Sequence, residues 1–237
     1  MEIFKNENYL NVTYSNEKTP KTGYPYKLGT ELIRRTKVKS GKMLDLGCGR
    51  GEYLEVFSKM GFDVMGFDIT THMVDNFPTH TIDLETQLLP KKHKEKYDIV
   101  FSKSVIEHMK NPMGLLNAAY ESLKPGGIAV IMTPAWEYTY WGPFYSDYTH
   151  ITPWTKPALK DALKIAGFEC LTVEYFFQLP YVWKFPWLKP IIKLFRKIPI
   201  PYQPNYNVPW SVSNWFNILV RFSTEPMLFS IVKKPNK

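Results

Sequence analysis

Short apolar runs alternate with amphipathic stretches through most of the chain. Runs of apolar, β-branched and aromatic residues predict strands, and apolar residues spaced three or four positions apart predict helices. The predicted strands are residues 43–46, 63–68, 81–84, 97–102, 128–133 and 226–233. Helical patterns lie at 52–60, just before Leu123, and at 156–166. This alternation of strands and helices predicts one α/β domain.

A glycine-rich turn joins the first predicted strand to the first predicted helix. Residues 44–51 read LDLGCGRG, with glycines at positions 47, 49 and 51. These glycines let the backbone turn sharply and approach a ligand where a Cβ would clash. A strand, a glycine turn and a helix in this order predict the loop that binds a nucleoside-containing cofactor.

The details of this turn narrow the class of cofactor. A dinucleotide fingerprint would have its third glycine at position 52, where this chain has Glu52, and the Gly-Lys-Ser/Thr ending of a P-loop is absent. Glu52 places a negative charge at the helix N-terminus, which argues against a phosphate there. The second strand ends at Asp68, 21 positions after Gly47, near the separation expected of a carboxylate that binds ribose hydroxyls.

These motifs resemble those of the class I S-adenosylmethionine-dependent methyltransferases. The match comprises the E/D-x-G-x-G-x-G motif at 45–51, the LKPGG turn at 123–127 and their order, over residues 40–177 plus the last strand. The resemblance implies a Rossmann-like three-layer sandwich with a mostly parallel seven-stranded sheet in the order 3-2-1-4-5-7-6. It also implies S-adenosylmethionine as cofactor and S-adenosylhomocysteine as product.

The resemblance assigns cofactor contacts to positions along the first four strands. We expect Asp68 to accept hydrogen bonds from the ribose, Asp83 to contact the adenine amine and Leu84 to pack on the adenine ring. For Asp83, an exposed loop acid is the open alternative. The full set of expected cofactor contacts is Asp45, Gly47, Cys48, Gly49, Gly51, Tyr53, Asp68, Ile69, Asp83, Leu84 and Ser102.

Methyl transfer to a hydroxyl needs an aligned oxygen and a base to take its proton. We expect the base to be His150 or His108, with Asp147 orienting a histidine or binding the acceptor. The loop SDYTHITPWT at 146–155 resembles a stretch of methyltransferases that act on sugars. It also resembles small-RNA 2'-O-methyltransferases and ubiquinone-type O-methyltransferases, in which a histidine completes an E-x-x-E-H magnesium site.

Carried over to this chain, that metal site would consist of Glu107, His108 and His150. Its first glutamate position is occupied by Ser104, and the loss of one carboxylate weakens a Mg²⁺ site. We therefore favour a histidine base and leave a divalent metal as the alternative. For His108, packing at a helix end beside the cofactor also stays open.

The same loop supplies the expected acceptor contacts, Asp147, Tyr148 and Trp154. Aromatic residues crowd positions 136–148, and aromatic faces stack well on sugar rings or bases. We expect the acceptor to be a sugar or glycan hydroxyl, in a form that could be lipid-linked. The alternatives are a ribose 2'-hydroxyl of RNA, a quinone or phenol hydroxyl, and a partner subunit that binds the cofactor without catalysis.

Charge is concentrated near the C-terminus. Residues 178–237 hold nine Lys or Arg and one acid, while the other 177 residues hold 21 of each sign. Residues 187–198 predict an amphipathic helix with Trp187, Leu188, Ile191, Ile192, Phe195 and Ile198 on one face. We expect segment 181–198 to be a peripheral membrane contact or, equally, a lid or homodimer interface, with nucleic acid less favoured.

These patterns divide one domain, residues 1–237, into three parts. We expect an N-terminal cap at 1–38, a catalytic core at 39–177 and 221–237, and a basic aromatic insertion at 178–220. The two cysteines offer no disulfide framework, and the first residues lack an apolar signal core. These features predict a cytoplasmic enzyme, peripheral at a membrane surface if the insertion contacts lipid.

Overall fold

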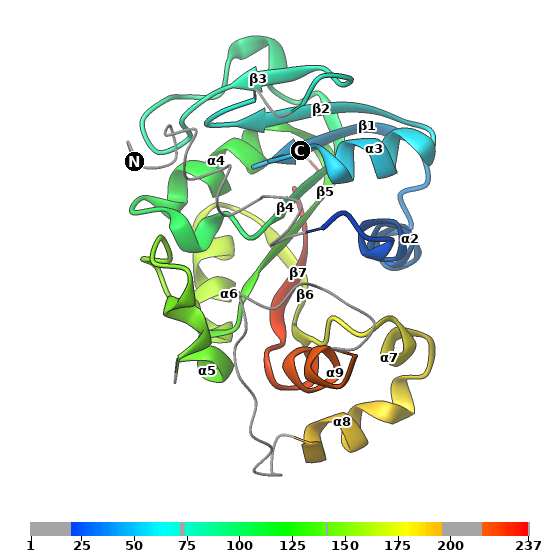
Figure 1. Ribbon diagram of the computed structural model, residues 1–237. Coiled ribbons are helices and arrows are strands. Elements are labelled where there is room, and N and C mark those ends of the chain that lie inside the picture. The colour runs from blue at the N-terminus through cyan, green and yellow to red at the C-terminus, as the bar shows by residue number, and fades with distance from the viewer. Residues whose placement is uncertain (1–19, 72–73, 141, 196–214, 237) are drawn as a thin grey trace.

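The computed structural model describes residues 20–71, 74–140, 142–195 and 215–236. Seven strands form one sheet in the order β3-β2-β1-β4-β5-β7-β6, which confirms the predicted topology (Figure 1). The pairs among β1 to β5 are parallel, and β7 is antiparallel to both β5 and β6. The strands are β1 (Gly41–Leu46), β2 (Phe62–Asp68), β3 (Thr79–Thr81), β4 (Tyr97–Lys103), β5 (Leu123–Pro134), β6 (Glu169–Phe176) and β7 (Met227–Lys233).

Helices cover both faces of the sheet and complete three layers. One core cluster joins the sheet to α4 and α6, and the other joins it to α2, α3 and α7. The α-helices are α2 (Tyr24–Thr36), α3 (Glu52–Lys59), α4 (Pro112–Ser122), α5 (Trp136–Thr139), α6 (Lys156–Ile165), α7 (Pro180–Lys184), α8 (Lys189–Phe195) and α9 (Trp215–Thr224). Short 3₁₀ turns are η2 (Lys91–His93), η3 (Ile106–His108), η4 (Pro143–Ser146) and η5 (Pro186–Leu188).

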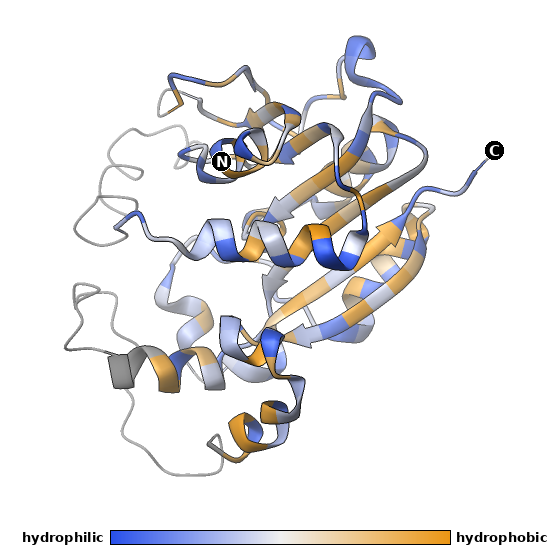
Figure 2. Ribbon diagram, turned by 90° about the vertical axis from the view of Figure 1, so that its right-hand side faces the viewer, coloured by the Kyte–Doolittle hydropathy of each residue, from blue (hydrophilic) through white to orange (hydrophobic). Residues whose placement is uncertain are grey.

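The central strands are apolar on both sides because both sides are covered. In β4, Val100 packs in the cluster with α4 and α6, whereas Ile99 and Phe101 pack in the cluster with α2 and α3. Neighbouring side chains of a strand point to opposite faces, so a strand buried twice must be apolar at successive positions. Figure 2 shows apolar residues along the strands of the central sheet.

The turn from β1 into α3 needs its glycines. Gly47, Gly49 and Gly51 have φ values of +82°, +50° and +73°, which side chains rarely allow. A Cβ on Gly47 would lie 2.2 Å from a methyl carbon of Val105. The turn therefore brings bare backbone to the edge of the sheet where the parallel strands end.

The structure corrects two predicted boundaries. The third strand is Thr79–Thr81 and not 81–84, because only these residues pair with β2, and Asp83 follows the strand in a turn. The predicted single helix at 187–198 is η5 followed by α8, and residues 196–198 lie outside the described part.

None of the helices in the described ranges combines the length and apolar character needed to cross a bilayer.

One ion-pair network fastens α2 to the C-terminal half of the sheet. The guanidinium of Arg35 lies 2.5 Å from Glu31, contacts Glu174 of β6, and sits 5.2 and 5.1 Å from the ring centres of Phe176 and Phe229. Its side chain is 18% exposed and that of Glu31 is 7% exposed. Arg34 also pairs with Glu31, but its side chain is 63% exposed.

Replacing Arg35 should destabilise the fold more than replacing its neighbour. We predict that Arg35→Met lowers the free energy of unfolding by about 1–3 kcal/mol, because it leaves nearly buried Glu31 with one partner and removes two cation–π contacts. Arg34→Met should lower it by less than about 1 kcal/mol, since exposed ion pairs contribute little. Urea unfolding of the two variants measures both effects, and equal losses would contradict the assignment.

Candidate active site

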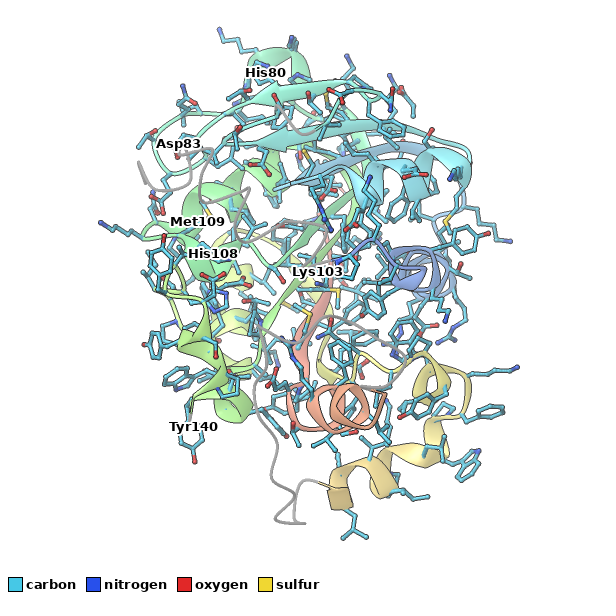
Figure 3. The ribbon with its side chains drawn as sticks, in the orientation of Figure 1. His80, Asp83, Lys103, His108, Met109 and Tyr140 are labelled. Atoms are coloured by element: carbon cyan, nitrogen blue, oxygen red, sulfur yellow. The ribbon has the colours of Figure 1, made fainter. Side chains whose placement is uncertain are left out.

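A cavity of about 780 Å³ opens at the carboxyl edge of the parallel strands. This volume suits a small-molecule ligand, and the position is where open α/β sheets bind ligands. Nine of the predicted cofactor positions line the cavity: Asp45, Gly47, Cys48, Gly49, Tyr53, Asp68, Ile69, Asp83 and Leu84. Figure 3 shows Asp83, Lys103 and His108 in the region where the strands end.

Asp68 ends β2 and faces the glycine turn. Its Oδ2 accepts a hydrogen bond of 2.8 Å from the backbone N–H of Gly49, and its Oδ1 accepts one of 3.2 Å from Thr70. These bonds fix the carboxylate at the cavity wall. Each oxygen has a second lone pair, so the carboxylate can also accept from a pair of neighbouring hydroxyls.

Asp45 is the second carboxylate at this wall. It is 2% exposed, and its Oδ2 has no hydrogen-bond partner among the described residues. Burial, together with the charge of Asp68, raises the pKa of Asp45 well above its ordinary value. A buried carboxyl group without a partner is costly, so this wall favours a cationic or hydrogen-bond-donating ligand group.

Two predicted cofactor contacts do not line the cavity. The hydroxyl of Ser102 donates to the carbonyl of Leu46 at 2.8 Å and is buried between β4 and β1. Gly51 precedes α3, where its positive φ shapes the turn. Their roles are therefore structural: Ser102 ties two strands together, and Gly51 lets the chain enter α3.

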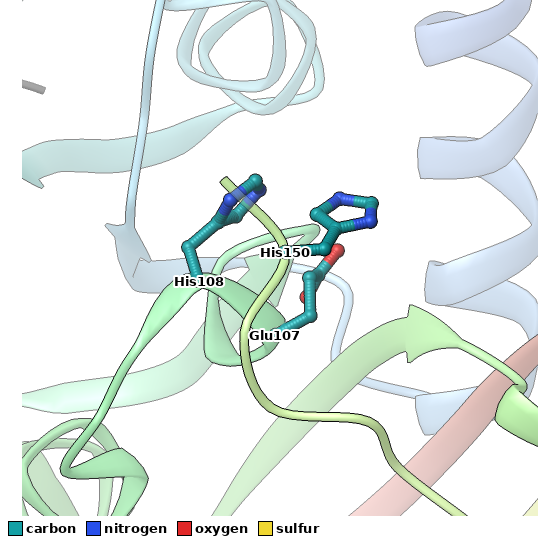
Figure 4. A group of neighbouring side chains, drawn as sticks. All are labelled: Glu107, His108 and His150. Atoms are coloured by element: carbon teal, nitrogen blue, oxygen red, sulfur yellow. The ribbon is translucent and has the colours of Figure 1, made fainter. Parts of the chain in front are cut away.

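Glu107, His108 and His150 meet on another side of the same cavity (Figure 4). One ligand atom from each of the three lies within 4.8 Å of the others, and the two imidazole centres are 4.6 Å apart. Glu107 and His108 belong to η3, just beyond β4. The backbone carbonyl of Glu107 accepts the N–H groups of Ile151 and Thr152, which docks the distant loop that carries His150.

Hydrogen bonding defines the proton position on His150. Its Nδ1 lies 2.6 Å from the carbonyl oxygen of Phe144. A carbonyl oxygen only accepts, so Nδ1 carries the proton and donates. In the neutral ring Nε2 is then the basic nitrogen.

A short relay defines the proton position on His108. The hydroxyl of Thr149 donates to Asp147 and lies 2.9 Å from Nδ1 of His108. Because a hydroxyl has one hydrogen, Nδ1 of His108 must donate to Thr149, which leaves Nε2 as the basic nitrogen. Burial lowers the pKa of His108, which favours the neutral ring. Burial acts to raise the pKa of Asp147, but hydrogen bonds from Thr149 hold it below the usual range.

Glu107 is fully buried beside the histidines. One carboxylate oxygen accepts the hydroxyl of Thr133 at 2.9 Å, while Oε1 has no hydrogen-bond partner among the described residues. Together with the Nε2 atoms of the two histidines, Oε1 gives the trio one oxygen and two nitrogen atoms that can serve as metal ligands. The trio can take up a proton or hold a cation.

Lys103 is a cavity residue that sequence reasoning missed. It is the last residue of β4, and its side chain lines the cavity near the centre of the molecule (Figure 3). Burial lowers its pKa, against the opposing charges of Glu107 and Glu52. The available signal was a lysine directly after an apolar strand, at the edge where ligands bind.

The last helix supplies a further wall. Arg221 and Phe222 of α9, together with Glu225 just beyond it, line the cavity. Arg221 pairs with Glu225 at 3.2 Å. These three residues directly follow the predicted insertion, 178–220, whose own Gln178 also lines the cavity. The basic and aromatic composition of the region did not reveal this relation to the site.

The structure separates the predicted acceptor contacts. Asp147 and Tyr148 line the cavity, whereas Trp154 is 6% exposed, packs in the core and donates its indole N–H toward the carbonyl of Ile106. The expectation that Trp154 contacts the acceptor is therefore corrected, because its local pattern did not distinguish a core tryptophan from a surface one. Within the aromatic cluster, Phe144 lines the cavity, Tyr140 is 61% exposed at the rim (Figure 3), and Trp141 lies outside the described residues.

Comparison with known proteins yields one family. A model described as a methyltransferase domain matches residues 23–173. A ubiquinone biosynthesis O-methyltransferase of Hydrogenovibrio crunogenus is 31% identical over 110 residues, which make up 42% of this chain and 46% of that relative. The matched segment thus spans less than half of the curated relative.

Solved structures agree with this fold. A methyltransferase from Archaeoglobus fulgidus, S-adenosylmethionine-dependent, has a TM-score of 0.60 at 23% identity and covers 92% of this chain and 97% of that one. A Haemonchus contortus phosphoethanolamine N-methyltransferase, in complex with S-adenosylhomocysteine, has a TM-score of 0.63 at 20% identity, covering 99% and 59%.

Those identities show the fold alone, while the matching domain model covers more than half of the chain. The glycine turn and the carboxylate that ends β2 lie within the matched residues, and the sheet order is the one that the sequence resemblance implied. The chain belongs to the methyltransferase domain family, among the class I S-adenosylmethionine-dependent methyltransferases.

Proposed function

We propose that this protein binds S-adenosylmethionine in the cavity and transfers its methyl group to a hydroxyl oxygen of a small phenolic or quinol-type acceptor. The observation that carries this proposal is the placement of two imidazoles, His108 and His150, in the cavity that also holds Asp45 and Asp68. A hydroxyl acceptor needs such a base, and the cofactor needs such carboxylates.

The residues of the first wall fit the cofactor. Asp68 can accept both ribose hydroxyls, and the buried Oδ2 of Asp45 suits the ammonium of the methionine part. Glu52 at the start of α3 suits a cofactor without phosphate. When bound, the cofactor supplies a sulfonium methyl group that is already electrophilic.

The histidines supply the proton acceptor. Nδ1 of His150 is hydrogen-bonded to the carbonyl of Phe144, and Nδ1 of His108 is hydrogen-bonded to Thr149, which in turn binds Asp147. Nε2 is therefore the nitrogen of each ring that can accept a proton. We assign the base to His150, because its loop position beside Tyr148 places it with the acceptor contacts. His108, 4.6 Å away, positions that ring. The imidazole takes the acceptor proton as the new oxygen–carbon bond forms, and S-adenosylhomocysteine is the leaving group.

The cavity wall favours a flat, partly apolar acceptor. Phe144, Met109 and Phe222 contribute apolar surface, and Lys103 adds an amino group that can donate a hydrogen bond to the acceptor oxygen. The ubiquinone O-methyltransferase name of the relative supports the same acceptor class. The sugar or glycan acceptor expected from the loop motif draws no support from the relatives' names and remains a competing outcome of an acceptor screen.

The trio of Glu107, His108 and His150 also fits a divalent cation. Two imidazoles and one carboxylate suit a first-row transition ion better than Mg²⁺, which prefers a shell of oxygens. Bound there, such a cation would polarise the acceptor oxygen. Ser104 stands where a further carboxylate would strengthen the site, so we keep the histidine base as the primary mechanism.

Removing the ribose carboxylate should weaken cofactor binding. We predict that Asp68→Asn weakens S-adenosylhomocysteine binding about 10-fold to 100-fold, since a hydrogen bond to a charged group contributes about 1.5–3 kcal/mol. Asp63→Asn, in the same strand but with a 69% exposed side chain, is the matched control and should bind normally. Calorimetric titration measures both; no heat of binding to the unaltered protein would refute the cofactor assignment.

Removing the base should separate binding from turnover. His150→Ala should bind S-adenosylhomocysteine with unchanged affinity and lose on the order of 100-fold or more in kcat, which is the usual contribution of a general base. The control His80→Asn changes a histidine on β3, away from the trio (Figure 3), and should keep its activity. Labelled-methyl transfer to catechol, saccharide and RNA acceptors gives the rates. Retained turnover in His150→Ala would reassign the base.

Chelation should distinguish a histidine base from a bound cation. We predict that activity changes by less than about twofold in excess EDTA, because Nε2 of His150 can accept the proton without a metal. Loss of activity that Mn²⁺ or Zn²⁺ restores would assign the trio to a metal site. Glu107→Gln should then abolish the restoration.

A further inference from the structure

Residues 177–195, which follow β6, are firmly attached to the fold. Trp183 of α7 stacks on Phe176 at 5.0 Å, and its indole N–H donates to the carbonyl of Phe177 at 2.6 Å. Ile192 of α8 is buried in a small core with Leu219 and other residues of this region. Figure 1 shows α8 at the lower rim of the molecule, below α9, and α7 beside α9. These contacts therefore hold α7 and α8 in a defined position.

The rim presents large apolar side chains to solvent. These side chains are Tyr181, Phe185, Trp187, Ile191 and Leu194, with exposed fractions of 39% to 67%. The rings of Phe185 and Trp187 are 6.5 Å apart. We call these five residues the rim patch. Scattered exposed apolar residues are normal, but a group of five within 14 positions indicates a contact surface.

The predicted apolar face of this segment is therefore divided. Ile192 points into the small core, whereas Ile191 and Leu194 are exposed. Ile191 and Leu194 are three positions apart, so they share one side of α8. Trp187 lies in the 3₁₀ turn η5, before α8, so its side chain does not follow the helical spacing of α8. One side of the segment anchors it, and the other is left for a partner.

The charges beside the rim patch are all positive. Lys184, Lys189 and Lys193 lie within or next to it, and the sequence from residue 175 to 224 has no acid. Among the residues that the structure describes, none of these lysines has a carboxylate within ion-pair distance. Tryptophan and tyrosine beside lysines match the interface of an anionic bilayer, where apolar groups enter the acyl boundary and ammonium groups meet phosphates.

The rim patch is also continuous with the wall of the cavity. Helix α8 packs against α9, and α9 contributes Arg221 and Phe222 to the cavity. Gln178, two residues before α7, lines the cavity as well. A surface docked through α8 would therefore lie one helix layer from the bound ligands.

We propose that the rim patch is a docking surface for an anionic phospholipid bilayer. Trp187 and Leu194 insert at the headgroup boundary, and the three lysines bind lipid phosphates. This proposal goes beyond methyl transfer and does not depend on it, because lipid binding can be measured without turnover. It places the acceptor cavity beside the membrane, where an acceptor with an apolar tail would be available.

Vesicle flotation tests the proposal on the full chain. We expect binding to vesicles of equal parts phosphatidylcholine and phosphatidylglycerol, and much weaker binding to pure phosphatidylcholine. Trp187→Ser with Leu194→Ser should reduce the binding constant at least tenfold. Neutralising Lys184, Lys189 and Lys193 to Gln should reduce it on the order of 100-fold, from about fivefold per lysine.

Matched controls carry the same changes on other surfaces. Leu88→Ser with Ile165→Ser removes two apolar side chains that are 89% and 76% exposed, and Lys91, Lys92 and Lys96 to Gln removes three exposed lysines. Both controls should float like the unaltered protein. Unchanged circular dichroism and S-adenosylhomocysteine binding of all variants would show that the fold persists.

Three results would overturn the proposal. The first is failure of the unaltered protein to bind anionic vesicles. The second is equal loss of binding in the rim variants and the controls. The third is a homodimer in light scattering that Trp187→Ser dissociates while vesicle binding stays unchanged, which would assign the rim patch to a second copy of this chain.

Discussion

Four neighbouring strands, β1, β2, β4 and β5, run parallel and end at one edge of the sheet, and this constraint creates the site. Each strand delivers the residues that follow it to the same small region, although they are far apart in sequence. The β1 turn must then leave room for a ligand, which is why Gly47 adopts a positive φ against Val105. A side chain at Gly47 would obstruct both the turn and the approach of η3.

The two walls of the cavity show a division of chemistry. Asp45 and Asp68 place two carboxyl groups in one wall, which suits the ribose hydroxyls and the ammonium group of the cofactor. Elsewhere the cavity holds the imidazoles of His108 and His150 together with Lys103, and in the proposed reaction these groups act on the acceptor oxygen. The groups proposed for the cofactor and those proposed for the acceptor are therefore different residues of one cavity.

The C-terminal helices connect this cavity to the outside of the molecule. Helix α9 contributes Arg221 to the cavity and packs on α8, whose other side is exposed. The composition of residues 178–220 indicated a contact surface without indicating its relation to the active site. The burial of individual side chains shows that relation: Ile192 is buried and attaches α8 to the fold, whereas its neighbour Ile191 is exposed and belongs to the rim patch.

By itself, the sequence determined the features that depend on local spacing. The glycine turn, the carboxylate of Asp68 and the succession of strands follow from neighbouring residues, and the sheet order followed from the family resemblance that they carry. Tertiary structure decided the features that need distant contacts. His108 contacts Thr149, 41 positions later, and that contact determines which ring nitrogen of His108 carries the proton. Tyr148 and Trp154 share one loop and one aromatic signal, yet only packing shows that Tyr148 lines the cavity while Trp154 is core.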